Sequence, residues 1–153
     1  MTRASGPVGR VHNDRVRAAR VNILFIGDVF GQPGREALLR WLPGFRDERA
    51  VDFVIANGEN AANGAGITSK LALRLLGGGV DVLTTGNHVW RQKEVYSFLA
   101  TDERIVRPAN YPAGSPGRGV TARPAAADGG EVAAMGRPRT MPNRLVAGKP
   151  QYG

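Results

Sequence analysis

The sequence predicts a layered α/β fold in which helices pack on a parallel sheet. Short runs of β-branched and aliphatic residues, typical of strands buried on both faces, recur along the chain. They alternate with longer segments in which apolar residues follow helical spacing. A succession of strand, loop and helix favours right-handed crossovers, and therefore strands that run parallel within one sheet.

Three runs have the composition of buried strands, and a fourth is shorter. They are residues 21–27, 51–56, 80–85 and 105–106. A glycine ends or closely follows each of the first three runs, which allows the chain to turn sharply there. The active crevice of such a sheet lies beyond the carboxyl ends of its strands, so the polar residues that follow each run are the candidates for a site.

Three helices are predicted between and after these strands. They cover residues 35–49, 68–77 and 91–100. Pro43 is expected to end or kink the first helix. Thr68 or Ser69 is expected to cap the second, and the glycines at 77–79 to stop it. The side chains expected to pack inward are Ala37, Leu38, Leu39, Trp41, Leu42, Leu71, Leu73, Leu75, Leu76, Val95, Phe98 and Leu99.

Charge and composition divide the chain into three parts. Residues 1–20 carry a net charge of +4 and residues 121–153 a net charge of +3, whereas residues 21–120 are nearly neutral at +1. Both ends have few aliphatic residues, so we expect a disordered basic extension and a divergent, disordered tail in which only residues 131–135 are typical of a strand. The basic ends could contact nucleic acid without sequence preference. The central part has no excess charge that would indicate a nucleic-acid-binding domain.

Several classes of protein are excluded or disfavoured by what the sequence lacks. The absence of cysteine excludes disulfides, a thiolate nucleophile and cysteine-based metal sites, so any metal must use oxygen and imidazole ligands. The longest apolar run, residues 21–26, is far too short to cross a bilayer. The first twenty residues lack the continuous apolar core of a secretory signal. We therefore expect a cytoplasmic protein.

Polar side chains follow three of the predicted strands. Asp28 ends the first, Glu59 and Asn60 follow the second, and Asn87 and His88 follow the third. Together they place carboxylates, carboxamides and an imidazole at one edge of the sheet, a mixture that suits hard or borderline divalent metals. A carboxylate between two cations can bridge them, as two-metal phosphoester hydrolysis requires.

Each of these residues also has a structural interpretation. Asp28 could cap the following helix, and Glu59 with Asn60 could form a solvated loop. His88 could be a structural hydrogen-bonding residue. The glycine-bearing turn at 27–34 could cradle a phosphate, but it lacks the dinucleotide and P-loop fingerprints. Their coincidence at one edge of the sheet favours a metal site.

Four segments resemble the amino-terminal half of the YmdB-like bacterial metallophosphoesterases, a branch of the calcineurin-like superfamily. In order, they are NILFIGDVFGQPGR, IANGENAANGAGIT, TTGNHVW and VRPANYPAGSPGRG, and they span residues 21–120. The resemblance implies part of an αββα sandwich. It also implies phosphodiesterase activity on 2′,3′- and 3′,5′-cyclic nucleotides at a dinuclear iron or manganese centre.

The resemblance also implies a role for each candidate residue. Asp28 and Asn60 match ligands of the first metal, Glu59 matches the carboxylate that bridges both metals, and Asn87 matches a ligand of the second. His88 matches the proton donor to the leaving oxygen. The family completes its centre with three histidines from a carboxyl-terminal half, whereas this sequence has no histidine after His88. We therefore expect a truncated or frameshifted phosphodiesterase with impaired activity and weak or incomplete metal binding.

Two other interpretations stay open on the sequence alone. The chain could be a non-catalytic binding module that docks a partner or RNA through its arginine-bearing ends, in which case it needs no metal. It could also be a pseudogene product without a stable fold, because half a sandwich exposes a sheet face. Metal content tests the first alternative, and circular dichroism with solubility tests the second.

Overall fold

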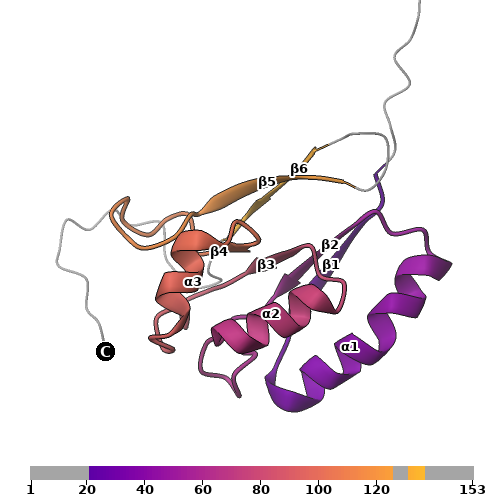
Figure 1. Cartoon of the computed structure of the whole chain (residues 1–153), viewed down its shortest axis with the longest axis horizontal. Coiled ribbons are helices and arrows are strands. Elements are labelled where there is room, and N and C mark those ends of the chain that lie inside the picture. The colour runs from indigo at the N-terminus through magenta and orange to yellow at the C-terminus, as the bar shows by residue number, and fades with distance from the viewer. Residues whose placement is uncertain (1–20, 126–130, 137–153) are drawn as a thin grey trace, which may run out of the picture.

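The computed structural model describes residues 21–125 and 131–136, which form one four-stranded sheet, one hairpin and three helices (Figure 1). The four-stranded sheet is parallel, with the strands side by side in chain order. Its strands are β1 (Ile23–Asp28), β2 (Phe53–Asn57), β3 (Val82–Thr84) and β4 (Ile105–Val106). The helices are α1 (Gly31–Glu48), α2 (Ser69–Gly77) and α3 (Val95–Thr101). The predicted α/β class and the four predicted strands are confirmed.

The helices cover one face of the sheet and a hairpin covers the other (Figure 1). The hairpin consists of β5 (Val120–Pro124) and β6 (Glu131–Met135), which pair antiparallel. Leucines of α1, α2 and α3 form the core on the helix side, while Phe53, Ile55 and Val82 are buried on the hairpin side against Val132 and Ala134. The described part of the chain is therefore a three-layer fragment of an αββα sandwich.

Helix α1 differs from its prediction at its first residue and at Pro43. It begins at Gly31 rather than Arg35, and Gly31 itself has a φ of +57°, which side-chain-bearing residues rarely adopt. It also continues past Pro43 to Glu48, so Pro43 does not end the helix, and the alternative that Pro43 kinks it stays a prediction. Leu42 is fully buried on one side of the proline. On the other side, Arg46 donates to the carbonyl oxygens of Val51, Asp52 and Gly79, and this anchorage holds the last turns in place.

Helix α2 begins and ends where the sequence predicts. The Thr68 hydroxyl accepts a hydrogen bond from the Leu71 amide at 3.2 Å, and the helix stops at the glycines. The prediction that Leu73 packs inward is wrong, because its side chain is 51% exposed and Ala72 occupies the buried position instead. The run of closely spaced leucines left the helical phase ambiguous, and the buried face follows the three- and four-residue spacing set by Ala72, Leu75 and Leu76.

The hairpin corrects one expectation about the carboxyl-terminal part of the sequence. The strand at 131–135 is confirmed, but β5 was not predicted, and residues 121–125 and 131–136 are not disordered. Small residues such as Ala134 alternate with exposed ones, so each strand buries one face against the sheet. This pattern is too weakly apolar to recognise in the sequence. The expectations for residues 1–20, 126–130 and 137–153 lie outside the described residues.

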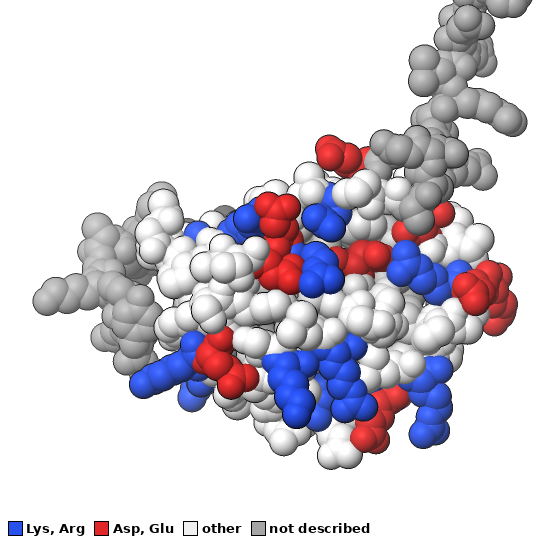
Figure 2. Space-filling model, in the orientation of Figure 1, with Lys and Arg blue, Asp and Glu red and all other residues white. Residues whose placement is uncertain are grey.

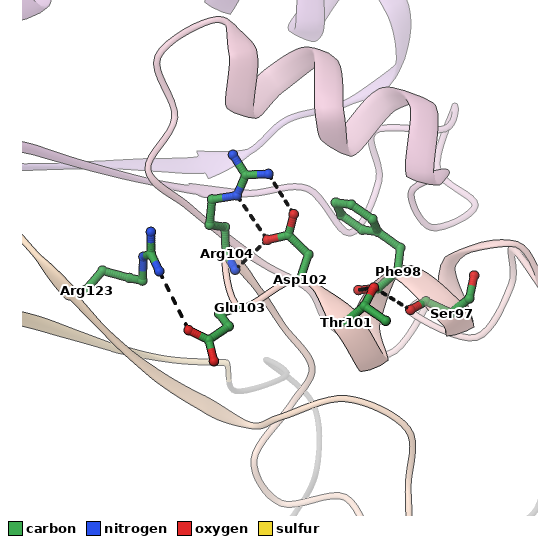
Figure 3. Close-up of polar contacts among 7 residues, drawn as sticks. All are labelled: Ser97, Phe98, Thr101, Asp102, Glu103, Arg104 and Arg123. Atoms are coloured by element: carbon green, nitrogen blue, oxygen red, sulfur yellow. Dashed lines mark hydrogen bonds and ion pairs between the residues drawn. The ribbon is translucent and has the colours of Figure 1, made fainter.

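Ion pairs connect the turn after α3 to the hairpin (Figure 3). Asp102 accepts hydrogen bonds from the Arg104 side chain at 3.0 and 2.6 Å, and Glu103 contacts Arg118 at 2.5 Å and Arg123 at 3.7 Å. The hydrogen bond from the Arg104 guanidinium lowers the pKa of the Asp102 carboxyl, against the opposing effect of burial. Acidic and basic side chains are interspersed over the face seen in Figure 2.

No helix within the described residues is both long and apolar enough to cross a membrane.

Candidate functional site

The polar residues predicted to share an edge do lie at the carboxyl ends of β1, β2 and β3. Backbone hydrogen bonds connect these ends directly. The Val29 amide donates to the carbonyl oxygen of Asn57, and the Gly58 amide donates to that of Thr84, each at 2.9 Å. The loops that leave the three strands are therefore held side by side, as the parallel topology predicts.

Asn60 is the link between the ends of β1 and β3. Its Nδ2 donates to both carboxylate oxygens of Asp28 at 2.9 Å. Its Oδ1 lies 2.9 Å from Nδ1 of His88. A single carboxamide thus joins a carboxylate and an imidazole that are sixty residues apart in the sequence. With Nδ1 of His88 occupied by Asn60, its Nε2 is the ring atom left for another partner.

Glu59 lies between the loops that follow β2 and β3. Its backbone amide donates to Oδ1 of Asn57 at 3.1 Å, which turns the chain after β2. Its carboxylate lies against Gly86, where an added Cβ would come within 1.3 Å of Oε2. Within residues 21–125 and 131–136, the half-buried Glu59 carboxylate forms no hydrogen bond or ion pair. Among the described residues, this carboxylate is therefore not paired with a lysine or arginine.

Asn87 is the candidate residue that the described structure does not join to the others. Its side chain is exposed, and no hydrogen bond among the described residues involves it. In the same part of the chain, no three His, Asp or Glu side chains gather closely enough to hold a metal ion on their own. The structure thus connects Asp28, Asn60 and His88 directly, places Glu59 beside Gly86, and leaves Asn87 at the surface.

The loop from Gly58 to Gly66 has a backbone shape that depends on local glycines. Gly64 and Gly66 have φ values of +83° and +82°, and Asn63 also has a positive φ. A Cβ on Gly66 would lie 2.7 Å from the carbonyl oxygen of His88, so this loop passes close to the loop that follows β3. The glycines let this loop carry Glu59 and Asn60 into the space between the neighbouring strand ends.

Two residues that support this loop were missed by the sequence analysis. Arg35, in the first turns of α1, donates through its guanidinium to the carbonyl oxygen of Ala61, and its Nε is buried without a partner in the described part of the chain. On the other side, Nε2 of Gln92 donates to the carbonyl oxygen of Ala65 at 2.7 Å. Arg35 lies within the first of the quoted segments, but no local pattern indicates which distant carbonyl an arginine will reach.

Tyr111 is a third residue near the site that sequence reasoning did not select. Burial raises the pKa of its phenol above the ordinary value, and the negative charge of Glu59 raises it further, which places the two residues in the same neighbourhood. Its ring centroid lies 6.0 Å from that of Trp90. Trp90 also contacts Tyr96 edge to face, with centroids 5.1 Å apart.

The chemistry of the donor set is compatible with an oxygen-liganded divalent cation. Asp28 and Glu59 supply negative charge, neither is paired with lysine or arginine within the described residues, and Asn60 adds a carboxamide oxygen. Hard and borderline cations prefer such ligands. A dinuclear centre needs more ligands than the described residues bring together.

Comparisons with known proteins identify the family of the chain. The family model of the YmdB-like protein matches residues 24–143. A 2′,3′-cyclic-nucleotide 2′-phosphodiesterase of Bacillus subtilis is 46% identical over 101 residues, which are 66% of this chain and 38% of the relative. The chain therefore spans less than half the length of that curated relative.

Two solved structures have the same fold over most of the described residues. A hypothetical protein from Thermus thermophilus superposes with a TM-score of 0.66 at 44% identity, covering 72% of this chain and 42% of that one. A novel phosphatase from Mycoplasma pneumoniae superposes with a TM-score of 0.60 at 29% identity, covering 67% and 38%. The fold, the matched segments and the family model lead to one conclusion: the chain belongs to the YmdB-like protein family.

Proposed function

We propose that this chain carries the amino-terminal part of a metal-dependent phosphodiesterase site for cyclic nucleotides. The hydrogen-bonded series Asp28, Asn60 and His88 at the carboxyl edge of the sheet is the observation that carries the proposal. It joins a metal-binding carboxylate to a group that can transfer a proton. The similarity to a 2′,3′-cyclic-nucleotide 2′-phosphodiesterase supports this class of substrate, and the 3′,5′-cyclic nucleotides form the second part of the proposal.

Four side chains are assigned to metal ligation. Asp28 and Asn60 would hold a first cation, Glu59 would be shared between this cation and a second, and Asn87 would contribute a ligand to the second. When bound, such cations polarise the phosphoryl oxygens and lower the pKa of water that attacks phosphorus. Iron or manganese is proposed as the metal because both accept carboxylate and carboxamide oxygen ligands. The position of Glu59 against Gly86, with no lysine or arginine paired with it among the described residues, supports its role as the bridging carboxylate.

His88 is assigned to proton donation. Asn60 holds Nδ1, so the ring is oriented and Nε2 can give a proton to the ribose oxygen that leaves phosphorus. The half-buried imidazole has little freedom to turn, because its partner Asn60 is itself held by Asp28. The two hydrogen bonds from Asn60 to Asp28 thus help to fix the orientation of the proposed proton donor, His88.

The described residues hold only part of this site. With fewer ligands than a dinuclear centre needs, the chain by itself should bind metal weakly and hydrolyse cyclic nucleotides slowly or not at all. The longer relatives contain further chain that this one does not match. We therefore assign full activity to this chain only together with the remaining part of the fold.

A fusion tests the proposal. Residues 1–125 of this chain are joined to the part of the Bacillus subtilis relative that follows the equivalent position, and the fusion is assayed with Mn²⁺ on 2′,3′-cyclic AMP. We expect turnover by the fusion, loss of about a hundredfold or more in Glu59→Gln, and little turnover by the unfused chain. A soluble, folded fusion that binds Mn²⁺ without hydrolysing any cyclic nucleotide would overturn the proposed activity.

The role of His88 has a separate test in the same fusion. His88→Ala should lower the rate per bound metal by about a hundredfold while leaving most of the metal content in place, because general acid catalysis contributes on that order. Glu59→Ala should lower both. If His88→Ala removes the metal but leaves the rate per metal unchanged, His88 is a ligand and the assignment is wrong.

A further inference from the structure

Phe30 is a mostly exposed aromatic residue at the carboxyl edge of the sheet. It follows Asp28 by two residues, at the position that caps the first turn of α1, and its side chain is 58% exposed. Helix caps are usually serine, threonine, aspartate or asparagine, whose side chains accept hydrogen bonds from the first amides of the helix. The Phe30 side chain makes no such hydrogen bond. Neither helix capping nor burial in the core therefore accounts for an aromatic residue at this position.

The Phe30 ring lies beside the loop that carries Glu59 and Asn60. A Cβ added to Gly64 would come within 3.2 Å of Cε2 and 3.5 Å of Cζ of this ring. Gly64 has a φ of +83°, so its backbone conformation and the neighbouring ring both favour a residue without a side chain. The outer atoms of the ring therefore lie next to bare backbone of the site loop, while much of the side chain stays open to water.

Backbone hydrogen bonds fix the position of this ring relative to Asn60. The carbonyl oxygen of Asn60 accepts from the amide of Gly31, the residue after Phe30, at 3.1 Å. It also accepts from the amide of Gly64, beside the ring, at 3.0 Å. The side chain of the same Asn60 donates to Asp28. One residue therefore holds both the segment that carries the exposed ring and the carboxylate of the candidate site.

The location of Phe30 suits contact with the base of a bound nucleotide. Two residues of chain span at most about 7 Å, so Phe30 lies within the length of a nucleotide from Asp28. Bases have flat π faces, and stacking on an aromatic side chain binds them without requiring a particular base. The other exposed aromatic residues of the described chain lie in a strand or in helices rather than in the loops at this edge, and they are Phe25, Trp41 and Tyr96.

We propose that Phe30 is the base-contacting residue of this site, and that its exposed ring stacks on the nucleobase of a nucleotide whose phosphate lies at Asp28, Asn60 and His88. The place of the phosphate rests on the proposed function, whereas the stacking itself needs neither a metal nor hydrolysis. Stacking uses the flat face of a base rather than its hydrogen-bonding edge, so the site should accept different bases and hold the larger purines more tightly than pyrimidines. A ribose phosphate without a base should bind most weakly.

The contact can be tested in the 153-residue chain by nuclear magnetic resonance, without any assay of hydrolysis. The chain carries ¹³C-labelled phenylalanine, and the ring signals of Phe30 are those that disappear in Phe30→Leu. The probes are 2′,3′-cyclic AMP and ribose 5-phosphate, each with Mg²⁺ present. We expect adenine to shift the Phe30 signals upfield and to give nuclear Overhauser contacts with them, and ribose 5-phosphate to do neither.

Three results would overturn the inference. The first is the absence of any contact between adenine and Phe30, and the second is contact of adenine with a different ring. The third is a set of Phe30 signals that move with protein concentration but not with the nucleotide, because a second copy of the chain would then cover the ring.

Variants of Phe30 separate stacking from simple apolar contact. Phe30→Ala should weaken the binding of 2′,3′-cyclic AMP by about fivefold or more, since a base stacked on an aromatic side chain typically contributes that much. Phe30→Leu keeps an apolar side chain without a ring and should weaken binding as well, whereas Phe30→Trp should retain it. Leu73→Ala, at a 51% exposed position on α2, is the control and should bind like the parent chain. Parent-like affinity in Phe30→Leu would show that the ring is not needed and would contradict stacking.

The fusion distinguishes this inference from the proposed activity. Phe30→Ala in the fusion should raise KM for 2′,3′-cyclic AMP by about fivefold or more with little change in kcat, because the ring contacts the base and not the reacting phosphorus. KM for ribose 2′,3′-cyclic phosphate, which has no base, should stay the same. Nucleotide binding that depends on Phe30 in a fusion without hydrolysis contradicts the activity alone. Hydrolysis with a KM that Phe30→Ala leaves unchanged contradicts the base contact alone.

Discussion

Strands β1 and β2 have nearly the same kind of sequence and very different surroundings. Phe53 of β2 is 1% exposed, while Phe25 of β1 is 62% exposed on the same face of the sheet. Both strands have the β-branched and aliphatic composition of strands buried on two faces. The difference arises from the neighbours, because the β5–β6 hairpin reaches Phe53 and Ile55 but not Ile23 and Phe25.

The site repeats this asymmetry. On the β2 and β3 side, Glu59 is packed against Gly86 and the loop is held through Arg35 and Gln92. On the β1 side, Asp28 is exposed and held through Asn60. One half of the site is therefore shaped by packing within the described residues, and the other half borders an uncovered edge. Strand β1 therefore has the composition of a buried strand, although no element among the described residues covers Ile23 and Phe25.

The largest contrast should appear in stability when each phenylalanine is removed. Phe53→Ala should lower the free energy of unfolding by about 3–5 kcal/mol, because it opens a cavity in the core. Phe25→Ala should change it by less than about 1 kcal/mol, because its side chain is mostly in water already. Urea unfolding followed by circular dichroism measures both. Similar losses in the two variants would show that β1 is covered in solution.

The second contrast concerns two glycines at strand ends. A Cβ at Gly86 would overlap the Glu59 carboxylate, whereas a Cβ at Gly27 meets nothing within 4 Å. Gly86→Ala should therefore displace the Glu59 carboxylate, and because this carboxylate is the end of a flexible side chain the variant should lose only about 1 kcal/mol of stability. Gly27→Ala should be neutral or stabilise the fold by about 0.5 kcal/mol through the unfolded chain. Thermal unfolding measures both, and a Gly86→Ala variant more stable than the parent chain would contradict the placement of Glu59.

Much of the fold could be predicted because local composition determines it. The buried strands, the Thr68 cap and the glycine stop of α2 each depend on residues close together in the sequence. Helical phase was harder, because four leucines in six residues allow more than one buried face, and Leu73 was assigned wrongly. Strand β5 was missed because its one fully buried side chain is the polar Thr121, and its pairing with β6 depends on residues about ten positions away.

The site could be predicted as a set of residues but not as a geometry. Parallel strands bring Asp28, Asn60 and His88 to one edge, and that follows from topology. The central position of Asn60 between the other two, and the contact of Glu59 with Gly86, depend on how three loops pack against one another. Arg35 was missed for the same reason, since its partner Ala61 is 26 residues away.

A third contrast, of intermediate size, tests whether Asn60 holds the two sides of the site together. In the fusion with the Bacillus subtilis relative, Asn60→Ala removes a proposed ligand and both hydrogen bonds to Asp28. Mn²⁺ affinity should fall by about tenfold or more, since losing groups that orient a ligand typically costs that much. Asn110→Ala, at an exposed position, is the control and should keep the affinity. Titration of free Mn²⁺ by electron paramagnetic resonance gives both values.

The smallest expected effect is on the titration of Tyr111. Burial and then the Glu59 charge raise the pKa of Tyr111, so its phenol should ionise above the ordinary value of 10.0. Because the folded state holds this proton more tightly than the unfolded state does, the stabilisation is complete below the ordinary pKa and is lost as the pH rises through the folded value. Absorbance of phenolate measured in the double variant Tyr96→Phe, Tyr152→Phe reports Tyr111, and addition of Tyr111→Phe to that variant is the control. Glu59→Gln should lower the midpoint of Tyr111 but leave part of the shift, because burial is the larger cause. An unchanged midpoint would show that Glu59 lies too far from Tyr111 for its charge to raise the pKa of the phenol.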